Sequence, residues 1–239
     1  MNAIKPEISV IIPALNEEKY IPITLESLKQ QSFNDFEVIV VDGGSTDRTR
    51  EISRKWGAKV VIEEGKGAGI ARNTGAKHAK SNLLIFLDAD TKASKNLLSI
   101  YYNKFKTHHE VVAATGPILP IEKTNRKIRL GYKFVTIVFV KASIMLGRAA
   151  LVGSNFACRA KAFKKVGGFD PKMITYEDWD LSARLDRIGR IVYIKKARVR
   201  TSARRAMAWG VWFYFKYHLV NMLVYHTMRK PRSDYEAIR

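Results

Sequence analysis

The chain contains, at residues 84–90, the sequence Leu84-Ile85-Phe86-Leu87-Asp88-Ala89-Asp90. The four apolar residues predict a buried strand, and the two carboxylates follow directly after it. Because neighbouring negative charges repel each other, such a pair is a poor choice for stability alone. It is well suited to hold a divalent cation against a phosphate-bearing ligand.

Strand-like and helical patterns alternate around this stretch through the first half of the chain. Strands are expected at residues 8–12, 36–41, 59–62 and 83–87, and helices at residues 16–31, 46–56, 69–79 and after Ser94, which is expected to cap the last of them. Asn16 is expected to cap the first helix, with Pro22 as an alternative start. Alternation at this spacing predicts an α/β fold with a mostly parallel central sheet that helices cover on both faces.

Polar loops follow three of these strands. They are Pro13 to Glu17, Asp42 to Asp47, and Asp88 to Asp90. Parallel strands place their carboxyl ends along one edge of the sheet, and ligands of open α/β sheets bind beyond that edge. We therefore expect the three loops to lie side by side and to form one site.

The second half of the chain changes character. Strands are expected at residues 111–115, 156–159 and 191–194, and helices at residues 126–146, 161–166 and 177–188. The helix at 126–146 becomes increasingly apolar along its length. No internal repeat and no low-complexity linker divides the chain.

The 239 residues carry a formal net charge of +20. This surplus suits an anionic partner, which could be a nucleotide diphosphate, nucleic acid or a membrane surface; a solvated basic surface is the alternative. The single cysteine, Cys158, excludes an internal disulfide and a Cys-based zinc site, and favours a reducing, cytosolic location. Residues Met1 to Glu7 contain no apolar run of the signal-peptide type, and no uninterrupted stretch predicts a membrane-spanning helix.

Two acidic motifs suit chemistry, although each has a purely structural alternative. Asp42-Gly43-Gly44-Ser45-Thr46-Asp47 can bring Asp42 to a base or ribose, or can be a tight turn with a helix cap. Glu177 and Asp178 begin a helix, whose N-terminus keeps a carboxylate ionised and available as a general base. An ordinary acidic first turn is the alternative there.

Basic residues occur in two further motifs. Arg72 and Asn73 lie near a helix start and suit polar contact with a nucleotide or with the aspartate pair. Arg204 and Arg205 follow a predicted strand and can bind phosphate oxygens through their paired N–H groups. General surface charge explains the second motif equally well in so basic a chain.

Seven motifs follow one another along the chain, namely Pro13-Ala14-Leu15-Asn16-Glu17-Glu18, Asp42-Gly43-Gly44-Ser45-Thr46-Asp47, Gly69-Ile70-Ala71-Arg72-Asn73, Asp88-Ala89-Asp90, Gly153-Ser154-Asn155-Phe156, Gly167-Gly168-Phe169-Asp170 and Glu177-Asp178-Trp179-Asp180. In this order they resemble the family-2 inverting glycosyltransferases of GT-A fold. The resemblance implies a GT-A domain at residues 1–205, with a nucleotide-binding half at 1–116 and an acceptor and catalytic half at 117–205. Residues 206–239 would form an aromatic, basic helical extension. The Q-x-x-R-W motif of processive polysaccharide synthases is missing, which argues against a polymerising synthase.

The resemblance also implies roles for individual residues. The nucleotide sugar would be bound by Pro13, Ala14, Asn16, Glu17, Asp42, Gly44, Arg72, Asp88, Ala89, Arg204 and Arg205. Asp90, together with Asp88, would hold Mn²⁺ or Mg²⁺. Asp178 would be the catalytic base, and Glu177 would fix its neighbour or contact the acceptor.

The implied reaction moves a sugar from a nucleotide diphosphate sugar to an acceptor hydroxyl by a single displacement that inverts the anomeric configuration. The acceptor would be a glycan or a lipid-linked molecule. Phe134 to Leu146 and Ala206 to Tyr225 are apolar or aromatic segments with basic residues in or beside them, and predict peripheral contact with an anionic membrane at its cytosolic face. Packing on the domain, or in an oligomer interface, is the alternative for both segments.

Two other classes of protein remain as alternatives. A nucleic-acid-binding protein would explain the charge, but three acidic loops along one edge would repel a phosphate backbone, so no nucleic-acid partner is expected. A nucleotidyltransferase also combines an α/β sheet with carboxylate-bound metal. It would need a basic triphosphate loop after the first strand, where Pro13 to Glu18 is acidic instead.

Overall fold

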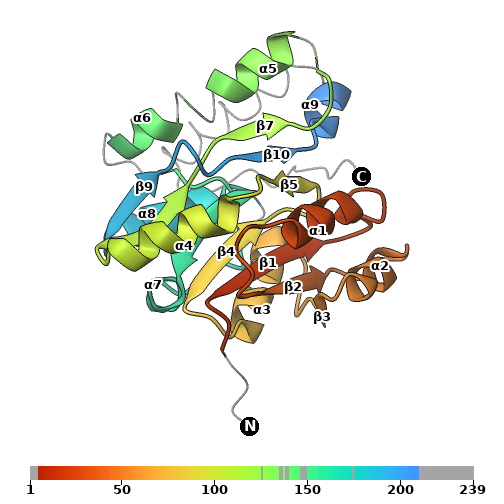
Figure 1. Ribbon diagram of the computed structural model, residues 1–239, viewed down its shortest axis with the longest axis horizontal. Helices are drawn as coiled ribbons and strands as arrows, with labels where there is room; N and C mark the ends of the chain where they lie inside the picture. Colours follow the sequence, from red (N-terminus) through yellow and green to blue (C-terminus); the bar gives the residue numbers. More distant parts are fainter. Residues whose placement is uncertain are drawn as a thin grey trace.

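The computed structural model describes residues 5–124, 126–134, 137, 140–145, 150–173 and 175–209. Within these residues a seven-stranded sheet has the order β3-β2-β1-β4-β8-β6-β9, and a three-stranded sheet has the order β5-β10-β7 (Figure 1). The strands are β1 Ile8–Ala14, β2 Phe36–Asp42, β3 Lys59–Ile62, β4 Leu83–Leu87, β5 Thr91–Ala93, β6 Val111–Thr115, β7 Ile118–Pro120, β8 Asn155–Arg159, β9 Arg190–Tyr193 and β10 Val199–Thr201.

The large sheet is mostly parallel, as the alternation of strands and helices predicts. β1 pairs in parallel with both β2 and β4, and β2 pairs in parallel with β3. β8 is antiparallel to its two neighbours, β4 and β6, and β6 pairs in parallel with β9. The carboxyl ends of β1, β2 and β4 therefore meet along one edge.

Helices cover both faces of the large sheet, whereas α5 lies against β7 of the small sheet (Figure 1). The described helices are α1 Ile21–Lys29, α2 Thr49–Lys55, α3 Ala68–His78, α4 Leu97–Thr107, α5 Arg126–Lys133, α6 Val140–Met145, α7 Ala160–Lys165, α8 Glu177–Asp186 and α9 Arg204–Trp209. Val10 and Ile12 belong to one core with Leu25 of α1 and Tyr101 of α4. Ile11, whose side chain points to the opposite face because strand residues alternate, packs in a second core formed with α3, α7 and α8.

Helix α3 lies unusually close to the sheet. A Cβ atom added to Gly75 would lie 2.4 Å from Cγ2 of Ile11 and 3.0 Å from Cγ2 of Val41. Only a residue without a side chain fits there, so Gly75 fixes how near α3 comes to β1 and β2. This contact places Arg72, one turn earlier on α3, against the end of the sheet.

The small sheet brings the end of the described chain back to the aspartate pair. β10 is antiparallel to β5, with Thr201 opposite Thr91, and the backbone N–H of Ser202 donates to the carbonyl of Asp90. α9 begins directly after this point. Strands β5 and β7 were not expected from the sequence, because three-residue strands leave too short a pattern to recognise.

Two expectations about the first loop are corrected. Pro13 does not end β1, which continues to Ala14. The pairing of β1 with β4 stops at Ile11, so no hydrogen bond of that ladder needs the N–H that proline lacks. Asn16 does not cap a helix. Its backbone has a left-handed φ of 54°, and α1 begins at Ile21, in agreement with the alternative start near Pro22.

Other boundaries also differ from expectation. α2 begins at Thr49 rather than Thr46, and Ser94 does not cap α4, whose N-cap position is Asn96. A single helix is expected at 126–146. In its place the structure describes two helices, α5 and α6, and several residues between them lie outside the described part. Of the aromatic segment Ala206 to Tyr225, only the part up to Trp209 is described.

Candidate functional site

The loops after β1 and β2 interlock through hydrogen bonds. The backbone N–H of Asn16 donates to Oγ of Ser45 at 2.9 Å, and the N–H of Thr46 donates to Oδ1 of Asn16 at 2.8 Å. The N–H of Glu17 donates to Oγ1 of Thr49 at 2.8 Å. Each loop thus supplies donors and acceptors to the other, and the left-handed turn at Asn16 is what allows its side chain to reach across.

Asp42 ends β2 and is fully buried. Its Oδ2 accepts hydrogen bonds from the backbone N–H groups of Gly44 and Ser45, both at 3.1 Å, and lies 3.5 Å from Nε of Arg50. Gly44 has a φ of +90°, which is why a glycine is needed in this turn. The other oxygen, Oδ1, is buried with no hydrogen-bond partner among the described residues.

Arg72 connects the first half of the chain to the second. Its Nη2 donates to Oδ1 of Asp88 at 2.7 Å, and its Nη1 donates to Oε1 of Glu177 at 2.9 Å. The residue is only 3% exposed, and its guanidinium lies 5.6 Å from the centre of the Phe169 ring. Burial lowers the pKa of Arg72, but Asp88, Glu177 and Asp178 together raise it above its usual value.

Asp178 follows Glu177 in the first turn of α8. Its Oδ2 accepts from the backbone N–H of Gly153 at 3.0 Å, and its Oδ1 accepts from the N–H of Trp179 at 2.9 Å. Burial, followed by repulsion from Glu177, raises the pKa of Asp178 to about 7, although Arg72 opposes the shift. The start of α8 therefore does not keep this carboxylate fully ionised at neutral pH, contrary to expectation, and the group exchanges its proton near that pH.

Asp90 belongs to a second charged group, at the junction of the two sheets. Oγ1 of Thr201 donates to Oδ1 of Asp90 at 2.9 Å, and Nη2 of Arg204 lies 3.5 Å from Oδ2. Arg204 also forms a two-pronged ion pair with Glu17, in which Nη1 donates at 2.9 Å. Burial, with repulsion from Asp88 and Glu17, raises the pKa of Asp90 to about 7 against the opposing effect of Arg204.

These carboxylates suit a divalent cation. Within the described residues no three or more His, Cys, Asp or Glu side chains gather as a complete set of metal ligands. Asp88 and Asp90 are nevertheless oxygen donors that repel each other, and a cation between them would relieve that repulsion. Mg²⁺ and Mn²⁺ are held by one or two carboxylates when a phosphate ligand and water complete the coordination, so the donor set fits such an ion.

The structure brings together most of the residues singled out in the sequence. A line of contacts runs from Asp42 through the interlocked loops to Glu17, Arg204 and Asp90. Asp88, two residues before Asp90, continues this line through Arg72 to Glu177, the neighbour of Asp178. The expectation that the three strand ends share one edge is thus met by the geometry.

Several of the remaining residues lie close by without presenting a free polar group. Pro13 pairs with Val41, and the carbonyl of Ala14 accepts from the N–H of Gly43. The side chain of Ala89 is buried and its carbonyl accepts from Oγ1 of Thr24. Arg205 follows Arg204 on α9, where successive residues point about 100° apart, so the two side chains leave the helix in different directions.

Two residues of this edge were given no role from the sequence. Thr201 donates to Asp90 across 111 positions of sequence, a separation that no local pattern reveals. Glu63 follows β3, and its carboxylate approaches Gly43, next to Asp42. The sequence does carry a signal for Glu63, because it is an acidic residue directly after a predicted strand. The same reasoning singled out the residues at the ends of the other three strands.

The chain is similar in sequence to known glycosyltransferases. The sequence profile described as glycosyl transferase family 2 matches residues 9–167. The probable glycosyltransferase YdaM of Bacillus subtilis is 29% identical over 227 residues, which cover 87% of this chain and 53% of that protein. The 4,4'-diaponeurosporenoate glycosyltransferase of Staphylococcus haemolyticus is 36% identical over 140 residues, covering 55% of this chain and 37% of that protein. The chain thus spans about half the length of the first relative and about a third of the second.

Solved structures share the fold. The mannosyltransferase PcManGT from Pyrobaculum calidifontis, in complex with GDP-Man and Mn²⁺, has a TM-score of 0.70 at 21% identity and covers 95% of this chain and 66% of its own. Residues 1–349 of TarS from S. aureus, in complex with UDP-GlcNAc, have a TM-score of 0.67 at 24% identity and cover 96% and 68%. These likenesses confirm the expected GT-A fold. Because the family profile covers well over half of the chain, the protein belongs to glycosyl transferase family 2.

Proposed function

We propose that this protein transfers a sugar from a nucleotide diphosphate sugar to an acceptor hydroxyl, with inversion, in a single displacement. The observation that carries the proposal is the bridge from Asp88 through Arg72 to Glu177, beside Asp178. The bridge links the aspartate pair, which suits a metal ion and a diphosphate, to Asp178, whose carboxyl group exchanges its proton near neutral pH. A displacement of this kind needs these two functions on opposite sides of one reacting carbon.

In this proposal, residues 1–116 bind the nucleotide and residues 117–205 supply the acceptor side. Asp42 and the interlocked loops after β1 and β2 receive the nucleoside. Relatives whose names describe glycosyltransferases, and structural neighbours that hold UDP-GlcNAc or GDP-Man, support this class of donor.

Asp90 and Asp88 would hold Mn²⁺ or Mg²⁺. The cation would neutralise charge that develops on the leaving diphosphate. Arg204, which binds Glu17 and lies beside Asp90, is placed to turn one of its N–H groups to a phosphate oxygen. Because phosphate oxygens compete with Glu17 for the same guanidinium, donor binding would loosen that ion pair.

Asp178 is the base in this scheme. Its ionised carboxylate would accept the proton of the acceptor hydroxyl as that oxygen attacks the sugar, and a pKa near the working pH favours this role. Hydrogen bonds from Gly153 and Trp179 fix its two oxygens. Glu177 is held by Arg72 and would position its neighbour.

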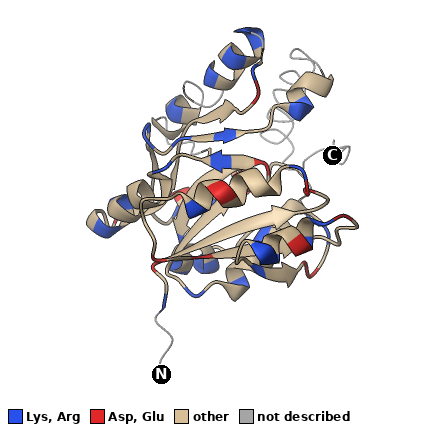
Figure 2. Cartoon of the chain, turned by 45° about the vertical axis from the view of Figure 1, so that its right-hand side comes forward, with Lys and Arg blue, Asp and Glu red and all other residues tan. Residues whose placement is uncertain are grey.

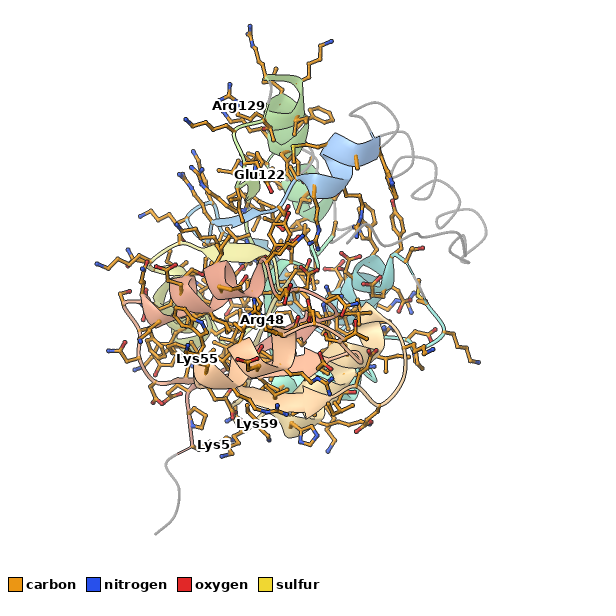
Figure 3. The ribbon with its side chains drawn as sticks, turned by 90° about the vertical axis from the view of Figure 1, so that its right-hand side faces the viewer. Lys5, Arg48, Lys55, Lys59, Glu122 and Arg129 are labelled. Atoms are coloured by element: carbon orange, nitrogen blue, oxygen red, sulfur yellow. The ribbon has the colours of Figure 1, made fainter. Side chains whose placement is uncertain are left out.

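The surface around α5 suggests where the acceptor is met. Arg126, Lys127, Arg129 and Lys133 are exposed on this helix, and Leu130 and Phe134 expose 54% and 62% of their surface. Arg129 lies at the opposite end of the molecule from Lys5 (Figure 3). No Asp or Glu occurs between Glu122 and Asp170, and Glu122 is engaged by Ser202 and Ala203.

A helix that combines exposed cations with exposed apolar side chains suits the headgroup region of an anionic bilayer. Exposed Lys92 and Arg200 extend the positive charge onto β5 and β10 (Figure 2). No helix in the described part of the chain is long and apolar enough to span a membrane. We propose peripheral contact through α5, with a lipid-linked or glycan acceptor presented at that surface.

A panel of sugar nucleotides tests the proposed reaction. Each UDP-, GDP- and dTDP-sugar is added to the protein with Mn²⁺ or with EDTA, and thermal stabilisation and release of nucleoside diphosphate are measured. We expect one nucleotide class to stabilise the protein and to be turned over only with metal. If no sugar nucleotide binds under any condition, the proposal is wrong.

A further inference from the structure

Two carboxylates at neighbouring strand ends each have one unsatisfied oxygen. Oδ1 of Asp42 and Oε1 of Glu63 are both buried, and neither has a hydrogen-bond partner in the described part of the chain. A buried acceptor without a donor destabilises a protein by an amount comparable to a lost hydrogen bond. The free energy of binding would therefore favour a ligand that brings donors to both atoms.

The second oxygen of each carboxylate is already used. Oδ2 of Asp42 accepts from the N–H groups of Gly44 and Ser45. The backbone N–H of Gly67 donates to the Glu63 carboxylate. Each residue thus has one engaged oxygen and one oxygen left for a ligand, but two backbone N–H groups hold the Asp42 carboxylate and only one holds that of Glu63.

The two side chains face the same small region. β2 and β3 run in parallel, and the N–H of Glu63 donates to the carbonyl of Asp42 at 2.9 Å. A Cβ atom on Gly43 would lie 2.7 Å from Oε2 of Glu63 and 3.6 Å from Cβ of Leu15. The missing side chain at Gly43 therefore makes room for Glu63 beside Asp42. Asp42 is fully buried and Glu63 only partly, so Glu63 is the side chain that would move to admit a ligand.

The nucleobases differ in whether they can satisfy two such acceptors. Guanine carries two adjacent donors, N1–H and the N2 amino group, on one edge. Uracil and thymine carry a single N–H between two carbonyl oxygens, and one of those carbonyls would meet the second carboxylate. Adenine and cytosine place an acceptor next to their amino group, with the same consequence. A base that leaves a buried carboxylate unpaired, or places a carbonyl oxygen against it, binds more weakly than one that donates to it, so such a site discriminates between bases.

We infer that Asp42 and Glu63 together select guanine, so that the donor is a GDP-sugar. This inference rests on the proposed function, because it names the nucleotide of the same site. Since Oδ2 of Asp42 is occupied by its own turn, Asp42 alone offers one acceptor, and Glu63 supplies the second. Glu63 is thus a specificity-determining residue.

Titration calorimetry with GDP and UDP, each in the presence of Mn²⁺, tests the inference. Wild-type protein should bind GDP at least about ten-fold more tightly than UDP, the difference expected for one hydrogen bond to a charged group. Glu63→Gln replaces one acceptor oxygen by an N–H₂ donor. It should weaken GDP binding by about ten- to hundred-fold and strengthen UDP binding, because the amide can donate to a uracil carbonyl.

Glu64→Gln is the matched control. Glu64 is the next residue, is exposed and pairs with Lys77, so the same change of charge there should leave both affinities unaltered. Tighter binding of UDP by the wild-type protein, or an unchanged ratio of affinities in Glu63→Gln, would overturn guanine selection and leave the proposed reaction standing. Failure of both nucleotides to bind would overturn both. If Glu63→Gln does not fold, the wild-type preference decides alone.

Discussion

The guanidinium of Arg72 lies 2.7 Å from the carboxylate of Asp88, and both groups come from loops or helices at the same end of the sheet. The same guanidinium binds Glu177, which is 105 positions away in sequence. A single buried cation thus holds the aspartate pair after β4 against the start of α8. Arg72 therefore sets how far the proposed metal ligand Asp88 lies from the proposed base Asp178.

Replacing Arg72 by glutamine should destabilise the protein strongly. The change leaves Asp88, Glu177 and Asp178 close together without a compensating charge, and breaking a buried ion pair costs about 3–5 kcal/mol. Urea unfolding measures the free energy. Arg48→Gln, which removes the partner of Glu18 in an exposed pair, should cost less than about 1 kcal/mol. Equal losses in the two variants would show that Arg72 does not hold the site together.

Asp178→Asn should lower the rate of transfer strongly while donor binding is retained. The amide keeps the size of the side chain but cannot accept a proton, and loss of a general base lowers kcat by about 10²–10⁴-fold. Turnover and nucleotide affinity are measured in parallel. The same change at Asp180, two residues later on α8, should keep turnover, since Asp180 pairs with Arg184 instead. Near-normal turnover of Asp178→Asn would refute its role as the base.

The pKa of Asp178, raised to about 7, predicts how activity and stability vary with pH. The base must be ionised, so kcat/KM should fall about ten-fold per pH unit below that value. Stability changes in the other direction. The neutral carboxyl is favoured in the folded state, so its contribution is fully present below about pH 4 and is lost as pH rises through about 7.

The Asp178→Asn variant separates the pH dependence of stability that comes from Asp178 from that of the other titrating groups. The variant lacks the ionisation, so its Tm should exceed that of the wild type by more at pH 8 than at pH 4. Thermal unfolding at the two pH values is sufficient. A difference in Tm that stays constant between them would mean that Asp178 titrates with an ordinary pKa.

Charge reversal on α5 tests the proposed membrane contact. Arg126→Glu combined with Arg129→Glu should reduce flotation with anionic vesicles by at least about ten-fold, since each basic residue near such a surface contributes about 1 kcal/mol. Lys161→Glu with Lys164→Glu makes the same change of charge on α7 and should float like the wild type. If the α5 variant floats as well as the control at moderate salt, α5 does not bind the membrane.

The sequence predicts the first half of the fold well because its signals are local. The buried run before Asp88 and the spacing of neighbouring strands are visible within short windows, and β3, β4 and β6 have the expected limits. The left-handed turn at Asn16 was missed because an asparagine before acidic residues is also typical of a helix cap. Contacts such as Arg204 with Glu17, which join residues 187 positions apart, follow from how the two sheets meet and leave no trace in either segment alone.

Calorimetric titration of a nucleoside diphosphate, with Mn²⁺ or with EDTA, into the wild type and Asp90→Asn tests most directly whether the gathered carboxylates bind a metal and a donor together. We predict binding to the wild type only with metal, at least ten-fold weaker binding to Asp90→Asn, and unchanged binding to Asp35→Asn, a variant at an exposed position before β2. Equal affinity in EDTA, or an Asp90→Asn variant that binds like the wild type, would contradict it.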